Sequence, residues 1–246
     1  MKLVLAEPRL LKESVGIISE LVNEVTFKLD KDKIEITAMD PANVAMVMFK
    51  MLSSAFVEYD IKGAQDLSVN LDNLNQVLKR AKPSDTIILE TVDNKLKITL
   101  KGERTSTFSL SLIDVEESEQ KIPDLKFDVK VEMPSVVLSD AVDDMEIVSE
   151  SVALIAESNK ITVQSEGRFN AAKVEVPATE GIIIKMKDSR VLSKYSIEYL
   201  KKIVKGSKIA ETVDLNFGRE YPLRADYKIM DRLMLSFILA PRVDND

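Results

Sequence analysis

The sequence contains neither cysteine nor histidine. Without cysteine, disulfides, thiolate metal sites and cysteine nucleophiles are all excluded. Without histidine, the chain also lacks the residue most often used for proton transfer near neutral pH, which is also the commonest metal ligand. Catalysis would have to rely on carboxylates, lysine, serine or a bound metal. We therefore expect a protein that is not an enzyme and that carries no cofactor.

Glycine, proline and aromatic residues are scarce as well. The chain of 246 residues has 7 glycines, 8 prolines and 5% aromatics, whereas 45% of its residues are hydrophobic. This composition argues against collagen-like, low-complexity and disordered classes, and the length suffices for one large core or two ordinary ones. No apolar run reaches the roughly 18 residues that span a bilayer, and the opening MKLVLAEPRLLKES lacks a signal-peptide core. We expect a soluble, cytoplasmic protein.

Basic residues are fewer than acidic residues, 34 against 41. The net charge is −7 and the isoelectric point is about 5.0. Taken alone, this balance argues against a nucleic-acid-binding protein, because most such domains are basic. Charged residues are shared evenly between the two halves, with no basic or acidic tail, so charge alone identifies no partner.

What the sequence does contain is an internal repeat. The segment LVNEVTFKLDKDKIEIT matches IVSESVALIAESNKITV when Val25 is set on Val152 and Ile36 on Val163, a spacing of 127 residues. Each copy follows an amphipathic run of helical period, RLLKESVGIISELV or VVLSDAVDDMEIVS, and itself alternates as two strands around a polar turn. A period above 100 residues indicates a duplicated domain and not a solenoid.

A second pair of segments extends the repeat. VNLDNLNQVLKRAKPSDTIILET matches YSIEYLKKIVKGSKIAETVDLNF at a spacing of 126 residues, and each predicts a short helix followed by a strand. Further strands are expected at AMVMFKM, KLKITLKG, STFSLSL, AAKVEV, GIIIKMK and MLSFILA. We predict an α+β protein with two topologically similar domains, residues 1–114 and 129–246. The connector between them, 115–128, contains apolar residues such as Ile122 that a plain spacer does not need.

Basic residues recur at matched positions of the second helix in each half. Lys201, Lys205 and Lys208 are spaced to form one stripe on a helix, and the corresponding earlier positions are Asn75, Lys79 and Lys82. Such a stripe is either an ordinary solvated helix face or a surface for phosphates, which lysine meets as a mobile point charge. The sequence leaves both interpretations open.

One acidic cluster allows the chain to be interpreted as a different class of protein, an enzyme. Asp140, Asp143 and Asp144 resemble a metal-binding carboxylate set, which would make the chain a metal hydrolase. Their spacing places them on the polar face of a helix, so we favour a solvated face. The sequence has no Gly-rich phosphate loop and no Cys/His metal cluster.

Four strings, taken together, resemble a known family. The strings are AMDPANVAMV (38–47), LKRAKPSDTIIL (78–89), LIDVEESEQKIP (112–123) and LAPRV (239–243). Together and in this order, they resemble the DNA sliding clamp named proliferating cell nuclear antigen (PCNA), in its archaeal form. The resemblance spans the chain. It implies a homotrimeric ring with helices lining the hole and sheets outside, which encircles duplex DNA without sequence specificity at the nucleoid.

The resemblance also implies a role in DNA replication and repair. Such a ring is placed by a clamp loader and tethers DNA polymerase, flap endonuclease and DNA ligase through short peptides. The main alternative is a specialised subunit of a heteromeric ring. A ring would reconcile the acidic composition with DNA, because negative charge can lie outside while basic residues face the hole.

Three sets of residues follow from the resemblance. The DNA-facing set is Lys12, Lys79, Arg80, Lys82, Lys201, Lys202, Lys205 and Lys208. The pocket for partner peptides is expected at Met39, Val44, Met46, Ile122, Pro123, Leu125, Pro222, Ile238, Ala240 and Pro241. The subunit interface is expected at Phe108, Leu110, Leu112, Lys173, Val174 and Val176. Gln120 and the acidic run around Asp143 depart from the eukaryotic pattern.

Overall fold

The computed structural model describes residues 1–115 and 120–242. The predicted connector and C-terminal domain therefore each include residues outside the described part, 116–119 and 243–246. The chain divides into two compact units. The first comprises Met1–Pro41, Val47–Lys121 and Ile229–Leu235, and the second comprises Ala42–Met46, Ile122–Lys228 and Ser236–Asp246.

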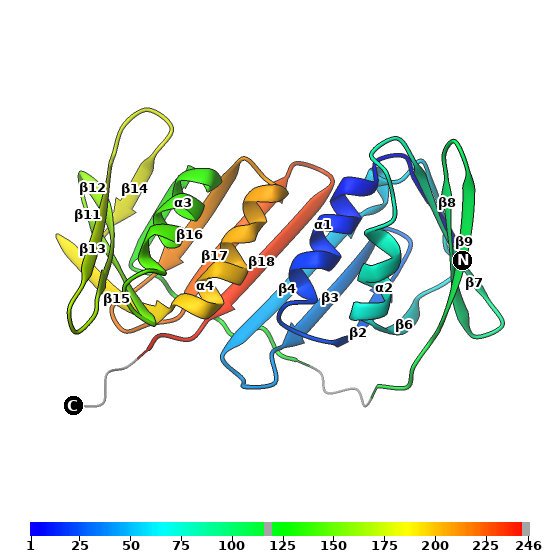
Figure 1. Cartoon of the computed structure of the whole chain (residues 1–246), viewed down its shortest axis with the longest axis horizontal. Coiled ribbons are helices and arrows are strands. Elements are labelled where there is room, and N and C mark those ends of the chain that lie inside the picture. Colours follow the sequence, from blue (N-terminus) through cyan, green and yellow to red (C-terminus); the bar gives the residue numbers. More distant parts are fainter. Residues whose placement is uncertain (116–119, 243–246) are drawn as a thin grey trace. The chain divides into compact units, whose positions relative to one another are not determined.

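The described part of the first unit contains two α-helices and two groups of antiparallel strands, arranged as in Figure 1. Its helices are α1 (Pro8–Ile18) and α2 (Leu71–Leu78), with a 3₁₀ turn η1 (Ser53–Ala55). One sheet has the order β5 (Glu58–Asp60), β1 (Lys2–Leu5), β7 (Thr86–Val92), β8 (Lys95–Lys101), β9 (Thr105–Ser111). The other group follows the order β4 (Ala45–Leu52), β3 (Lys33–Met39), β2 (Glu24–Leu29), β6 (Gln65–Asn70).

The second unit repeats this plan. Its helices are α3 (Ser135–Met145) and α4 (Ile197–Ile203), and α4 continues into the 3₁₀ turn η2 (Val204–Lys208). One group of strands follows the order β14 (Ile183–Met186), β10 (Val129–Pro134), β16 (Thr212–Phe217), β17 (Leu223–Ile229), β18 (Leu233–Leu239). The other sheet has the order β13 (Ala171–Pro177), β12 (Lys160–Glu166), β11 (Ser151–Glu157), β15 (Arg190–Ser196).

Equivalent hydrogen bonds confirm the duplication at the level of the backbone. The amide of Leu71, at the start of α2, donates to the carbonyl oxygen of Asn23 at 2.7 Å, and that of Ile197, at the start of α4, donates to Glu150 at 3.0 Å. Leu71 and Ile197 are 126 residues apart, whereas Asn23 and Glu150 are 127 apart. The two spacings found in the sequence therefore coexist in one repeated contact, and loops absorb the one-residue difference.

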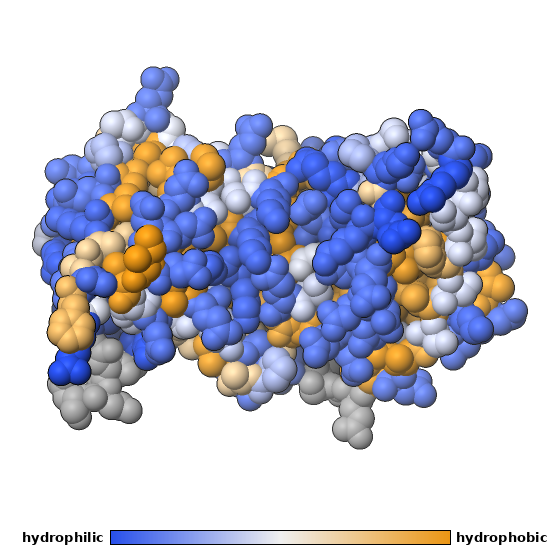
Figure 2. Space-filling view, in the orientation of Figure 1, coloured by the Kyte–Doolittle hydropathy of each residue, from blue (hydrophilic) through white to orange (hydrophobic). Residues whose placement is uncertain are grey.

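In each unit one helix contacts strands of both sheets. α2 packs on β6 and β9, while α3 packs on β10, β16, β12 and β13. Apolar side chains at helical spacing fill these contacts, and Leu10, Ile18, Val142 and Met145 are almost completely buried. The helix pairs α1–α2 and α3–α4 also touch within their own units. The opposite faces of the helices are left to solvent, and Figure 2 shows mainly hydrophilic residues over α1 and α2.

Two helices end earlier than their apolar periodicity predicts. The pattern continues to Val22 and Val148, but α1 ends at Ile18 and α3 at Met145. Leu21 and Val22 are nevertheless buried, because the chain continues in hydrogen-bonded turns over the same core. Val148 is partly exposed. The periodicity therefore reports burial correctly at Leu21 and Val22, and it overestimates the length of both helices.

Candidate nucleic-acid interface and peptide site

The predicted basic residues of the first unit gather around the C-terminal end of α2. Lys12, on α1, donates from Nζ to the carbonyl oxygen of Ala81 at 3.1 Å and lies 3.5 Å from that of Lys79. Lys79 and Arg80 are exposed beside it. Cations are favoured here, because the last carbonyls of a helix carry partial negative charge. Lys82 forms an ion pair with Glu103 at 3.1 Å, so it offers less free charge.

The prediction of a basic helical stripe is wrong in this unit. α2 ends at Leu78, so Lys79 and Lys82 lie in the following turn. Asn75 is buried, and its side-chain amide donates to Ser19 Oγ at 3.0 Å, which links α2 to α1. The three residues match the spacing of a stripe, yet Asn75 packs between the helices and Pro83 stops the chain from continuing as a helix.

The second unit has a row of basic residues, Lys201, Lys205 and Lys208, that begins in an α-helix and continues into a 3₁₀ turn. Lys201 and Lys202 lie in the last turn of α4, whereas Lys205 and Lys208 lie in η2. In an α-helix residues four apart share a face, and in a 3₁₀ turn residues three apart do so. The spacing of Lys201, Lys205 and Lys208 fits this change, so the three remain on one side.

Acidic neighbours accompany part of this row. Lys201 forms an ion pair with Glu146 of α3, and Lys202 pairs with Glu198 at 3.0 Å. Exposed ion pairs of this kind contribute only about 0–1 kcal/mol and are screened by salt. Phosphate groups could therefore replace these carboxylates at small cost.

The exposed carboxylates of α3 form no metal site. Asp140, Asp143 and Asp144 are exposed on the helix surface. Across residues 1–115 and 120–242, no group of three or more Asp, Glu, His or Cys side chains is placed to hold a metal ion. The metal-hydrolase interpretation therefore has no support in the described part of the chain. In the same part, no helix is both long and apolar enough to cross a membrane.

Two segments of the second unit meet at part of the predicted peptide pocket. The amide of Ala240 donates to the carbonyl oxygen of Val44 at 2.9 Å, which joins the loop after β3 to the segment after β18. Val44, Ala240 and Pro241 are partly exposed there. Met39 is partly exposed at the end of β3, in the first unit.

The connector reaches the second unit through Tyr221. The amide of Lys126 donates to the Tyr221 hydroxyl at 3.4 Å, and the rings of Phe127 and Tyr221 meet edge to face at 6.0 Å. Tyr221 is not among the residues expected from the sequence, although its place directly before Pro222 could have indicated a role. Leu125 and Pro222, on the two sides of this contact, are partly exposed, and Ile122 and Pro123 are exposed.

Two residues expected in the pocket are core residues instead. Met46 is only 3% exposed and Ile238 only 7%. Both lie in strands, where they support the surface from behind and cannot meet a peptide directly. Alternation in a strand does not tell a pocket wall from a core position when both faces of the strand are covered.

The strands expected at the subunit interface lie at sheet edges. β9 is the last strand of β5-β1-β7-β8-β9, and β13 is the first of β13-β12-β11-β15. Phe108 and Leu110 face the covered side of β9, opposite the buried Ile98 and Leu96. Leu112 lies just beyond the strand and is partly exposed. An edge strand presents unpaired backbone groups, which a second copy of the chain could pair.

Charged residues cover the other edge. On β13, Glu175 accepts from Lys160 at 2.6 Å and pairs with Lys173 at 2.9 Å. The hydrogen bonds from these two lysines lower the pKa of Glu175 to about 2. Val174 is partly exposed between them, and Val176 is buried. The edge therefore carries a fixed charge cluster at neutral pH.

Comparisons with known proteins cover both halves of the chain. Residues 1–121 match the family model "proliferating cell nuclear antigen, N-terminal domain", and residues 121–242 match the corresponding C-terminal domain. The "DNA polymerase sliding clamp" of Pyrococcus horikoshii is 39% identical over 228 residues, which cover 92% of each chain.

Two solved structures are similar over nearly the whole chain. A crystal structure of PCNA from Thermococcus kodakaraensis has a TM-score of 0.92 at 27% identity and covers 98% of this chain and 99% of its own. A chain of a PCNA2–PCNA3 complex from Sulfolobus tokodaii has a TM-score of 0.92 at 25% identity and covers 99% of this chain and 100% of its own.

Proposed function

Since the chain belongs to the proliferating cell nuclear antigen family, we propose that it is a DNA sliding clamp, a ring that encircles duplex DNA and tethers DNA polymerase. The observation that carries this function is the match of both halves, end to end, to the two domains of that clamp. Two further features support it. Each unit presents basic residues at the end of its second helix, and each has a sheet edge where a neighbouring subunit could pair.

The basic residues suit a ring that moves along DNA. Each neutralised phosphate adds affinity and salt dependence, so a dense basic surface would hold the ring in place. Here Lys82, Lys201 and Lys202 already share their charge with carboxylates. We infer weak, exchangeable phosphate contacts, because exposed ion pairs of this kind give way at small cost. The residues are Lys12, Lys79, Arg80, Lys82, Lys201, Lys202, Lys205 and Lys208. A closed ring stays on DNA by topology and needs little affinity.

Partner enzymes would dock on the second unit. Exposed or partly exposed apolar groups come from four segments: the loop after β3, the connector, the β16–β17 loop and the segment after β18. They are Val44, Ile122, Pro123, Leu125, Pro222, Ala240 and Pro241. Short peptides of polymerase, flap endonuclease and ligase would place apolar side chains there, while a clamp loader would open the ring. An Ile122→Ala, Leu125→Ala double variant should bind such a peptide at least tenfold more weakly, since each truncated anchor costs about 1–3 kcal/mol.

Fluorescence anisotropy with a labelled terminal peptide of an archaeal polymerase measures this affinity. Val57→Ala is the control, because Val57 is 72% exposed and lies in the first unit. Equal affinities of the double variant and the parent would place the docking site elsewhere.

We favour a homotrimer, because β9 of one copy could pair with β13 of the next and so close a ring of identical chains. The alternative is a subunit that assembles only with other chains. The similarity to a chain of the PCNA2–PCNA3 complex of Sulfolobus tokodaii does not favour it, because the PCNA of Thermococcus kodakaraensis has the same TM-score. The solution mass of the purified chain distinguishes them. A homotrimer gives three times 27.5 kDa, whereas a chain that stays monomeric at micromolar concentration would favour the heteromeric ring.

A further inference from the structure

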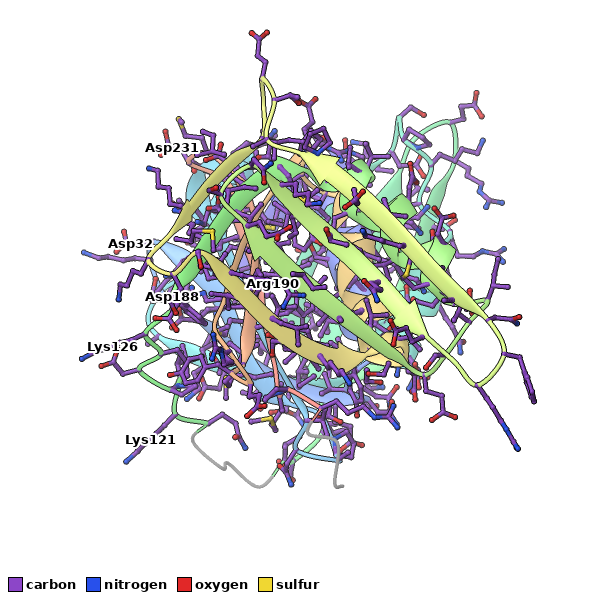
Figure 3. The ribbon with its side chains drawn as sticks, turned by 90° about the vertical axis from the view of Figure 1, so that its left-hand side faces the viewer. Asp32, Lys121, Lys126, Asp188, Arg190 and Asp231 are labelled. Atoms are coloured by element: carbon purple, nitrogen blue, oxygen red, sulfur yellow. The ribbon has the colours of Figure 1, made fainter. Side chains whose placement is uncertain are left out.

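A hollow of about 740 Å³ lies on the second unit, over the β11-β12-β15 face that points away from α3. Figure 3 looks onto this face, with Arg190 over it. The lining comes from these three strands, from the two loops beside them and from Arg242. None of these residues belongs to the predicted peptide site or to the basic row at the helix ends. The hollow is of a size that holds ligands in other proteins, about 300–1,000 Å³.

Small residues in the middle strand create the hollow. Ser151 and Ala153 of β11 are among the lining residues. Ala153 lies opposite Gln164 of β12 on one side and Lys194 of β15 on the other. Because cross-strand partners project from the same face of a sheet, long side chains stand on both sides of a small one. The result is a trough along β11.

Cations outnumber carboxylates in the trough. Its lining includes Arg168, Arg190, Lys194 and Arg242 but only two carboxylates, Glu150 and Glu166. Arg242 is held by Glu150, through its carbonyl oxygen at 3.1 Å and its carboxylate at 3.6 Å. The Arg190 guanidinium has no hydrogen-bond or ion-pair partner among the described residues. A net positive trough in a chain of net charge −7 is suited to an anionic ligand.

Two of the most exposed apolar side chains lie in the loops at its rim. Ile147 is 82% exposed in the α3–β11 loop, and Phe169 is 87% exposed in the β12–β13 loop. The loops touch at Gly167, where an added Cβ would lie 2.5 Å from the carbonyl oxygen of Val148. The Arg168 guanidinium lies 5.3 Å from the Phe169 ring. Apolar and cationic groups are thus side by side.

We propose that this trough is a second docking surface, which binds an acidic peptide segment of a partner protein with apolar residues beside its carboxylates. Arg190, Lys194 and Arg168 meet the carboxylates, and Ile147 and Phe169 meet the apolar side chains. A nucleic acid fits less well, because Glu150 and Glu166 would oppose a continuous row of phosphates and because the apolar rim has no phosphate partner. The surface adds to the peptide site and does not depend on it.

Peptide selection tests the proposal with the whole chain. A random dodecapeptide phage library is panned on the parent protein and depleted on an Arg190→Glu, Lys194→Glu variant. The recovered peptides should be rich in Asp and Glu next to Leu, Ile or Phe. A synthetic copy should bind the parent with an affinity that falls with salt, and bind the variant at least tenfold more weakly. The matched control, Lys185→Glu with Lys187→Glu, changes the charge equally at exposed positions of the same unit and should bind like the parent.

Three results would overturn the proposal. One is the recovery of no peptide that distinguishes parent from variant. Another is the recovery of neutral or basic peptides. The third is a loss of affinity for a 30-base-pair duplex, measured in parallel, that exceeds the loss for the peptide, because the trough would then be a nucleic-acid surface. Urea unfolding of the variant checks that the two substitutions, at the exposed Arg190 and the partly exposed Lys194, leave the fold intact.

Discussion

Gly206 shows how a single residue shapes the basic row of the second unit. It is buried in η2, where an added Cβ would lie 2.4 Å from ring atoms of Tyr227. Tyr227 is itself fully buried beside Phe237, so the ring has no room to move. The tight 3₁₀ turn that carries Lys205 and Lys208 therefore depends on the missing side chain.

Gly206→Ala should lower the free energy of unfolding by about 1–3 kcal/mol, the usual cost of overpacking a core. Urea unfolding followed by circular dichroism measures it. Gly63→Ala is the matched control, because nothing lies within 4 Å of its added Cβ, and it should change stability by less than about 0.5 kcal/mol. Equal stabilities of the two variants would contradict the close contact with Tyr227.

Glu175 should titrate far below an ordinary glutamate. Its hydrogen bonds with Lys160 and Lys173 hold its pKa at about 2, against an ordinary value of 4.5. A lowered pKa means that its contribution to stability is complete above pH 4.5 and is lost as pH falls through about 2. NMR titration of the carboxyl group should show this, and Lys160→Met should raise the pKa. Lys130→Met should leave it unchanged, whereas a pKa near 4.5 in the parent would show that the ion pairs do not persist.

At the scale of elements, the sequence predicted the repeated helices and hairpins and missed several strands. The spacings of 127 and 126 residues located α1, α3, α2 and α4 with the strands that follow them. β1, β5, β6, β15 and β17 were missed, because they are short or mix polar residues into the pattern, as in RVLSKYS. β10 was missed although its sequence, VKVEMP, alternates as a half-buried strand does. Their strand conformation is fixed by neighbours that lie far away in sequence. Burial of Met46, Ile238 and Asn75 was missed for the same reason.

The prediction on assembly concerns the edge strand β9. Leu112→Arg adds a charge beside the apolar side of this edge, so the variant should remain folded and sediment as a monomer. Val92→Arg is the control, since Val92 is 46% exposed at the turn between β7 and β8 of the same sheet. A Leu112→Arg variant with the same solution mass as the parent would show that β9 is not the interface.

On the scale of the whole molecule, duplication helps to explain how a chain of acidic composition can face DNA. Each unit buries its own core and leaves a few cations at the end of its second helix. The repeat and its helical spacing located these cations, and the family resemblance assigned them to DNA. Periodicity could not reveal the 3₁₀ turn, because it assumes one helix type. The lysines of the second unit stay on one side although α4 continues as a 3₁₀ turn, because spacings of four and then three residues keep one face in either helix type. The sequence also gave no signal for the trough over β11, which arises from side chains on three strands.

The lysines of the second unit should act together. Replacing Lys201, Lys205 and Lys208 by alanine should lower retention on nicked circular DNA and flatten its dependence on salt, because fewer counterions are released. A matched triple variant at Lys130, Lys185 and Lys187, which are exposed in the same unit, should keep the slope of the parent. Identical slopes for both variants would make the row an ordinary solvated face.

The most direct test of the sliding clamp is retention on DNA before and after the circle is cut. The protein is loaded on nicked circular DNA, free protein is removed by gel filtration, and half of the sample is linearised with a restriction enzyme. A topological ring should remain on the circle at a salt concentration that disrupts ordinary electrostatic binding and should slide off the linear DNA. Equal retention on circular and linear DNA would contradict encirclement and, with it, the proposed function.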